Sequence, residues 1–196
     1  NCDDLGYGDL GCYGAKDIRT PHLDRMAAEG TRFTDFSVTS ALCTPSRAAL
    51  MTGKYPARLH ITDWIAGHVK KNPKLLIPDW QQFLPQSEKT IAEYLKEKGY
   101  ATWHIGKWHL GEMQGTQPHQ VGFDEYFGIL SVVSEMSQVI DGHIYPEIVN
   151  KPERLAAVKK IASTRLIQGK RGEPTQVVKE MKTTEELGNL DQLFAE

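Results

Sequence analysis

The sequence of 196 residues predicts an α/β fold, in which helices flank a central and mostly parallel sheet. Two segments with helix signals, residues 20–30 and 90–99, each end at a glycine. Each is followed by a segment rich in β-branched and aromatic residues, 31–38 and 100–105, which indicates a strand. A helix, a glycine and a strand in this order, occurring twice, are typical of the βα units that build parallel sheets.

The two helices are predicted from the residues that start and end them. In the first, Thr20 is the expected N-cap, Pro21 the first helical residue and Gly30 the stop. In the second, Thr90 and Glu93 have the spacing of a capping box. Both segments place apolar residues on one face, so each helix is expected to pack against the sheet.

Three further helices are predicted. A short one is expected to be capped by Thr44, to start at Pro45 and to close at Gly53. Apolar residues at helical spacing predict another over residues 152–167, and a capping pattern at its start predicts the last over residues 183–194.

Composition excludes several classes of function. Hydrophobic residues make up 40% and charged residues 24%, which is ordinary for a globular protein with a core. A formal charge of −2 provides no basic field for nucleic acid and no polybasic patch for a membrane, and no apolar run is long enough to span a bilayer. The cysteines Cys2, Cys12 and Cys43 are too few and too irregular for a disulfide framework or a zinc site.

The most informative motif covers residues 43–53, Cys-Thr-Pro-Ser-Arg-Ala-Ala-Leu-Met-Thr-Gly. It puts Cys43, a small nucleophile, at the start of a helix, where free N–H groups and the helix dipole favour an anion. Arg47, one turn later, adds a permanent positive charge. The alternative on helix physics alone is a structural helix with a buried cysteine at its start.

Two other motifs carry side chains that could bind a cation or act on an anionic substrate. Asp3 and Asp4, followed by a glycine-rich turn, suit a hard cation that prefers oxygen ligands, although an acidic turn is the alternative. In the loop after the strand at 100–105, Lys107 offers charge and His109 can move a proton near neutral pH, although such a pair also occurs as surface decoration.

Together, the Cys-x-Pro-Ser-Arg, Asp-Asp-x-Gly and Gly-Lys-Trp-His-Leu-Gly motifs resemble the formylglycine-dependent sulfatases, an arylsulfatase-like family of the alkaline phosphatase superfamily. The resemblance covers residues 1–128, and residues 129–196 fall where the family varies with substrate. It implies an alkaline-phosphatase-like α/β sandwich of which residues 1–196 form the N-terminal catalytic part, incomplete at both ends.

The resemblance also implies a reaction, the hydrolysis of a sulfate ester to an alcohol and sulfate. In that family the equivalent of Cys43 is oxidised to formylglycine, whose hydrate attacks sulfur. By resemblance, Arg47 and Lys107 stabilise the nucleophile and the sulfate oxygens, and His109 takes the proton that lets the aldehyde reform.

The same resemblance implies a metal and partners. Asp3, Asp4 and the modified Cys43 are expected to bind a divalent cation, Ca²⁺ rather than Mg²⁺. The expected partners are a sulfated small molecule or glycan and a formylglycine-generating maturation enzyme, in a periplasmic, secreted or lysosomal setting. A phosphonate or phosphodiester hydrolase of the same superfamily, and a non-catalytic protein that binds sulfate, remain the alternatives.

Overall fold

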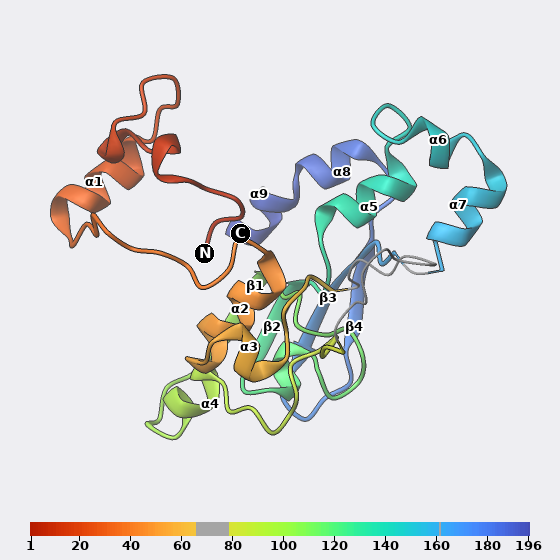
Figure 1. Cartoon of the computed structure of the whole chain (residues 1–196). Helices are drawn as coiled ribbons and strands as arrows, with labels where there is room; N and C mark the ends of the chain where they lie inside the picture. The colour runs from red at the N-terminus through yellow and green to blue at the C-terminus, as the bar shows by residue number, and fades with distance from the viewer. Residues whose placement is uncertain (66–78, 161) are drawn as a thin grey trace. The chain divides into compact units, whose positions relative to one another are not determined.

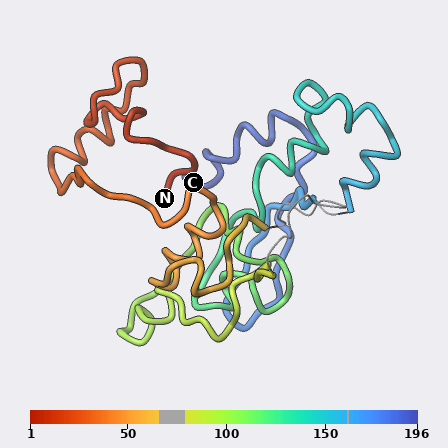
Figure 2. The backbone as a smooth tube through the Cα atoms, viewed as in Figure 1, coloured from red at the N-terminus to blue at the C-terminus, as the bar shows by residue number. Residues whose placement is uncertain are grey.

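The computed structural model describes residues 1–65, 79–160 and 162–196. The chain divides into two units, Asn1–Val38 and Thr39–Glu196, and Figure 2 traces the backbone of both. Within the described ranges, no helix combines the length and the apolar character that crossing a bilayer requires.

The first unit is a small helical segment held by polar side chains. Thr20 Oγ1 accepts a hydrogen bond from Gly11 N (2.8 Å), and Asp24 Oδ1 accepts one from Cys12 N (2.7 Å). These bonds tie the short helix η2 to the start of helix α1, which begins at Pro21 as predicted. The elements of this unit are η1 (Tyr7–Asp9), η2 (Gly11–Tyr13) and α1 (Pro21–Glu29).

The strand predicted over residues 31–38 is wrong, because the segment is irregular. Tyrosine side chains bind its backbone: the Tyr7 hydroxyl donates to Phe36 O (2.6 Å) and the Tyr13 hydroxyl donates to Phe33 O (2.7 Å). A strand needs a neighbouring strand for its ladder, and no described residue pairs with this segment.

The second unit contains a mixed sheet of four strands in the order β1-β2-β3-β4. β1 pairs with β2 in parallel, and the pairs β2–β3 and β3–β4 are antiparallel. The α/β class is therefore confirmed, but among the described residues only one strand pair is parallel. The strands are β1 (Trp103–Lys107), β2 (Glu125–Ile129), β3 (Arg165–Lys170) and β4 (Gln176–Glu180).

Helices pack on both faces of this sheet (Figure 1). One buried cluster joins Tyr126 and Ile167 of the sheet to Ala48, Leu59 and Ala92 of the first three helices of the unit. The other joins the opposite face to the last helices. The helices are α2 (Cys43–Thr52), α3 (Pro56–Leu59), α4 (Ile91–Lys96), η3 (Pro118–Gln120), α5 (Val133–Ile140), α6 (Pro146–Val149), α7 (Pro152–Val158), α8 (Thr184–Gly188) and α9 (Leu190–Ala195).

Several helix and strand boundaries differ from the predicted ones. The strand expected at 100–105 is β1, which starts at Trp103 and continues to Lys107. The helix expected over 152–167 is wrong beyond Val158, because Leu166 and Ile167 belong to β3, where both are buried. The segment 183–194 forms two helices, with the break at Asn189.

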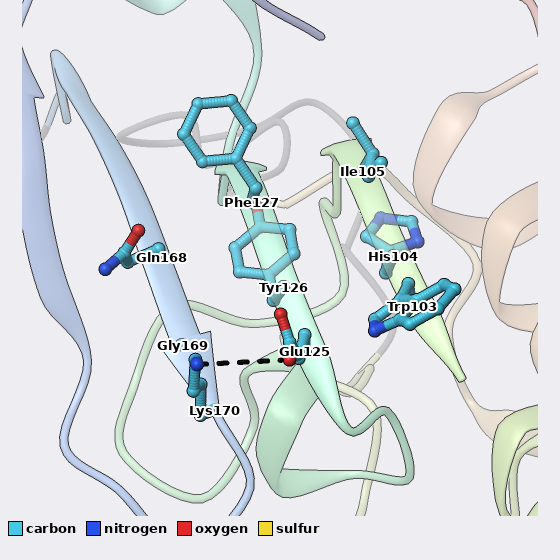
Figure 3. A pocket seen from close by; sticks show the side chains of 9 residues that line it. All are labelled: Trp103, His104, Ile105, Glu125, Tyr126, Phe127, Gln168, Gly169 and Lys170. Carbon is cyan, nitrogen blue, oxygen red and sulfur yellow. Dashed lines mark ion pairs between the residues drawn. The ribbon is translucent and has the colours of Figure 1, made fainter. Parts of the chain in front are cut away.

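Part of one sheet face is open to solvent. A hollow of about 260 Å³ lies over the first residues of β1 and β2 and the end of β3 (Figure 3). Trp103 and Ile105, 65% and 59% exposed, lie along it, and an ion pair between Lys170 and Glu125 crosses it (4.0 Å). Its lining is mainly apolar and includes none of the predicted site residues.

The parallel pair β1–β2 depends on two facing glycines. Gly106 and Gly128 are register partners, and Gly106 has a positive φ of 98° that turns its carbonyl out of the ladder, where Tyr126 Oη donates to it (3.2 Å). A Cβ on Gly128 would lie 2.0 Å from Gly106 O, and that atom belongs to backbone that cannot move aside cheaply.

We expect Gly128→Ala to lower the free energy of unfolding by about 3 kcal/mol or more, because the added methyl would push β1 and β2 apart. Urea denaturation followed by circular dichroism measures the change. Gly188→Ala in α8 is the matched control: no atom lies within 4 Å of its Cβ position. Equal stability of the two variants would contradict the proposed packing of β1 on β2.

Candidate functional site

The start of α2 carries the motif at residues 43–53. Cys43 is the first helical residue rather than the residue before the helix, so the prediction that Thr44 caps the helix is wrong. The Thr44 hydroxyl instead accepts a hydrogen bond from Ile65 N (3.2 Å). Thr44 and Pro45 are buried, whereas Cys43 is partly exposed with a free thiol. Cys43, the predicted nucleophile, therefore lies at the positive end of a ten-residue helix whose next residues, Thr44 and Pro45, are buried.

Arg47 connects this helix to the end of β1. Its Nη1 donates to the carbonyl oxygen of Lys107 (2.7 Å), a contact between residues 60 positions apart. His104 Nε2 lies 3.1 Å from the same oxygen. One carbonyl thus accepts from two side chains, and this fixes the point at which β1 ends and the Lys107–His109 loop begins.

The ring of His104 is part of an aromatic cluster and not a second acid–base group. It stacks on Tyr126 (5.5 Å between centroids) and meets Trp108 edge-on (5.3 Å). Burial, with a smaller contribution from the Arg47 charge, lowers the pKa of His104 to about 4, although the hydrogen bond to the Lys107 carbonyl acts in the opposite direction. Burial also raises the pKa of Tyr126. Both side chains are therefore neutral near pH 7, and Arg47 carries the local positive charge.

The second connection between the two motifs passes through His109. Its Nε2 bonds the carbonyl oxygen of Ile65, the residue whose N–H is bound by Thr44. His109 has a left-handed backbone with φ of 58°, and His109 N donates to Leu130 O (2.8 Å). The imidazole is almost fully buried, with 1% of its surface exposed. His109 and Thr44, the neighbour of Cys43, are therefore linked through Ile65, which His109 binds at its carbonyl and Thr44 binds at its N–H.

This contact fixes the tautomer of His109. A carbonyl oxygen only accepts, so Nε2 carries the hydrogen, and Nδ1 is the basic nitrogen of the neutral ring. Because the His109 backbone is left-handed, the alternation of side chains along an extended strand does not relate the directions of Lys107 and His109.

Four of the six predicted site residues are thus connected within the second unit: Cys43, Arg47, Lys107 and His109. Asp3 and Asp4 belong to the first unit, where both are exposed. In the ranges 1–65, 79–160 and 162–196, no group of three or more histidine, cysteine, aspartate or glutamate side chains could hold a metal ion.

Sequence reasoning missed a buried serine between β2 and α5. Ser131 is 1% exposed and donates to Glu135 Oε2. No motif marks these residues. Serine and glutamate four positions apart at a helix start were the only local signal.

Comparison with known proteins points to one family. The sulfatase family model matches residues 2–189. Human arylsulfatase A is 50% identical over 130 residues, 65% of this chain and 24% of that protein. N-acetylgalactosamine-6-sulfatase from Sus scrofa is 45% identical over 130 residues, 64% of this chain and 24% of that protein. The chain therefore spans about a quarter of the length of these curated relatives.

Solved structures agree. The PsFucS1 sulfatase from Pseudoalteromonas sp. superposes with a TM-score of 0.80 at 33% identity, over 97% of this chain and 37% of that chain. Ps i-CgsB, solved with k-i-k-neocarrahexaose, gives a TM-score of 0.60 at 32% identity, over 90% of this chain and 36% of the other. With the signature helix and the Lys107–His109 loop in contact, and with a family match over almost its whole length, the chain belongs to the sulfatase family.

Proposed function

We propose that the protein containing this chain hydrolyses sulfate esters to an alcohol and sulfate. The observation that supports this most directly is a pair of contacts to the end of β1 and the loop after it. Arg47 of α2 binds Lys107 O, and His109 binds Ile65 O, whose residue is in turn bound by Thr44 of α2. These contacts support the proposal because they join the chain segments that carry Cys43, Arg47, Lys107 and His109, which are far apart in the sequence.

Cys43 is the proposed nucleophile after oxidation to formylglycine. Cys43 is the first residue of α2, so negative charge that develops on its side chain is stabilised by the helix dipole. Arg47 and Lys107 supply positive charge to the sulfate oxygens. Because Arg47 also binds Lys107 O, it positions the loop as well as the substrate.

His109 is the proposed general base, acting at Nδ1. Nε2 keeps its hydrogen and donates it to the Ile65 carbonyl oxygen, so the ring keeps its orientation while Nδ1 gains and loses the proton. In this proposal, Nδ1 removes the proton from the remaining hydroxyl of hydrated formylglycine. That is the step that releases sulfate.

Asp3, Asp4 and the modified Cys43 are the proposed ligands of a divalent cation, Ca²⁺ rather than Mg²⁺. The two exposed carboxylates have the oxygen chemistry that such ions prefer. Ca²⁺ takes about 6–8 oxygen ligands, so this donor set fits the ion but requires further ligands from outside the described residues. A bound cation would supply charge stabilisation for the transferred group.

The proposed substrate is a sulfated glycan or a sulfated small molecule. Ps i-CgsB was solved with a neocarrahexaose, and a human relative bears the name arylsulfatase A. Rates on an aryl sulfate and on the aryl phosphate with the same leaving group test the reaction class. Faster phosphate hydrolysis would favour a phosphatase, and failure to hydrolyse either would favour a protein that only binds sulfate. The family resemblance supports a periplasmic, secreted or lysosomal location.

We expect Cys43 to carry formylglycine when the complete protein is made in a host with a maturation enzyme, because the Cys-Thr-Pro-Ser-Arg run that such enzymes read is intact. Mass spectrometry of the peptide containing residue 43 should show the aldehyde and its hydrate. Cys12, the free and partly buried thiol of the first unit, is the internal control and should stay unmodified. An active preparation with only a thiol at residue 43 would rule out this nucleophile.

A further inference from the structure

The side chain of His104 binds the backbone of its own strand three residues further on. Its Nε2 lies 3.1 Å from the carbonyl oxygen of Lys107. In a regular strand, residues three apart are separated by about 10 Å, because each residue adds about 3.3 Å. The contact forms because Gly106, between them, has a positive φ of 98° and departs from the extended backbone. The Lys107 carbonyl therefore lies beside the imidazole.

The peptide unit that joins Lys107 to Trp108 is bound on both sides. Its carbonyl oxygen has two lone pairs and accepts from two side chains, Arg47 Nη1 at 2.7 Å and His104 Nε2 at 3.1 Å. Its N–H, which belongs to Trp108, donates to Ile129 O of β2 (2.9 Å). Because a peptide unit is planar, these three hydrogen bonds fix the direction of the backbone where β1 passes into the loop.

An aromatic cluster holds the His104 ring in the position from which it donates. The ring stacks on Tyr126, with which it appears in Figure 3, and also contacts Trp108 and Phe123, with centroids 5.3 and 5.2 Å away. A carbonyl oxygen only accepts, so Nε2 carries the hydrogen. Burial lowers the pKa of His104 to about 4, so near pH 7 the ring is a neutral donor and adds no second positive charge beside Arg47.

We propose that His104 is a positioning residue of the site. Its hydrogen bond to the Lys107 carbonyl fixes the backbone from which the Lys107 side chain extends, and it fixes the oxygen that Arg47 binds. His104 acts through these two residues and not on the sulfate group itself. The effect on catalysis rests on the proposed function, in which Arg47 and Lys107 stabilise the sulfate oxygens. The effect on the loop does not rest on it.

Two variants of similar length separate the hydrogen bond from the packing of the ring. His104→Gln keeps an N–H donor, whereas His104→Met has none, and both lack the ring. With an aryl sulfate and the complete protein, His104→Met should lower kcat about tenfold or more and change KM less than about threefold, because small displacements of groups that act in the transition state are costly. His104→Gln should keep most of the kcat of the unmodified protein.

Thermal denaturation of the same preparations distinguishes positioning from packing. The apolar methionine should be at least as stable as glutamine inside the aromatic cluster, so the more active variant should not be the more stable one. Activity that follows stability overturns the proposal, as does equal kcat in the two variants. If either variant does not fold, His104→Phe, which keeps a ring and has no donor, should lose kcat about tenfold, and a normal kcat in His104→Phe overturns the proposal.

Phe123→Leu is the matched control within the cluster. Phe123 is buried and contacts the same imidazole, but its side chain has no atom that can bind the Lys107 carbonyl. Phe123→Leu should lower the melting temperature and leave kcat within about twofold of the unmodified protein. A loss of kcat in Phe123→Leu as large as that in His104→Met would show that the ring packing matters and the hydrogen bond does not.

Hydrogen exchange in the complete protein tests the loop without any substrate. Without the His104 donor, the Trp108 amide should exchange about tenfold faster in His104→Met than in His104→Gln. The Met181 amide, which donates to Thr164 O beside the edge strand β4 (2.8 Å), reports global opening and normalises the rates. Equal normalised exchange in the two variants overturns the proposal. If the unmodified protein hydrolyses no sulfate ester while exchange differs as expected, the proposed function is wrong and the role of His104 in the loop stands.

Discussion

Cys43→Ala in the complete protein is expected to lower turnover of an aryl sulfate by at least about 10³-fold, because it removes the covalent nucleophile. The side chain at this position is partly exposed, whereas its neighbours Thr44 and Pro45 are buried, so the loss should be chemical and not structural. Steady-state rates and thermal denaturation of the same preparation measure the two effects separately.

Cys12→Ala provides the comparison for this variant. Cys12 is also a free cysteine, and its contact to Asp24 is made by the backbone N–H, which the substitution keeps. Its activity should equal that of the unmodified protein. Substantial turnover by Cys43→Ala, with normal folding, would show that the reaction does not pass through residue 43.

Substitution of His109 is expected to slow sulfate release more than the attack on sulfur. Attack depends on the nucleophile and on the charges of Arg47 and Lys107, which survive the change. Release needs a base, and losing a general base typically costs about 10²–10⁴ in rate. A burst of alcohol close to one per site should therefore precede a slow steady state, and intact mass spectra should show sulfate on the peptide containing residue 43.

The choice of variant matters because His109 also binds the Ile65 carbonyl. His109→Ala removes both that contact and the base, whereas His109→Gln offers an amide N–H to Ile65 O and lacks the basic nitrogen. Both should show the burst, and Gln should retain more stability. Exposed His143 provides the control, His143→Ala, with normal kinetics. Slow turnover without burst or adduct would mean that His109 acts before sulfur is attacked.

The part of the site that the sequence predicted is the part carried by local motifs. Cys43 and Arg47 lie one helical turn apart, and Lys107 and His109 lie in one short loop, so their proximity within each pair follows from local geometry. The contacts between the pairs depend on Ile65 and on the Lys107 carbonyl, backbone groups that carry no signal in the residue types. The buried contact between Ser131 and Glu135 was also missed, because no motif marks these two residues.

The fold errors have similar causes. Leu155, Val158 and Leu166 have helical spacing, but the adjacent buried pair Leu166 and Ile167 suits a strand covered on both faces. The turn between β3 and β4 contains Gly172 with φ of 79°, a hairpin signal that the apparent helix period obscured. The segment 31–38 has the composition of a strand, but composition does not supply a neighbour to pair with.

The contact between Arg47 and the Lys107 carbonyl cannot form until both residues have been synthesised. Ribosomes add about 5–20 residues per second, so roughly 3–12 s pass between the synthesis of these two residues, 60 positions apart. During that interval the loop that packs against α2 does not yet exist, and a maturation enzyme that reads residues 43–47 as extended chain can reach Cys43. Afterwards Thr44 and Pro45 are buried. We therefore expect the proposed oxidation of Cys43 to compete with folding, and the number of residues between Arg47 and Lys107 to determine how long Cys43 stays accessible.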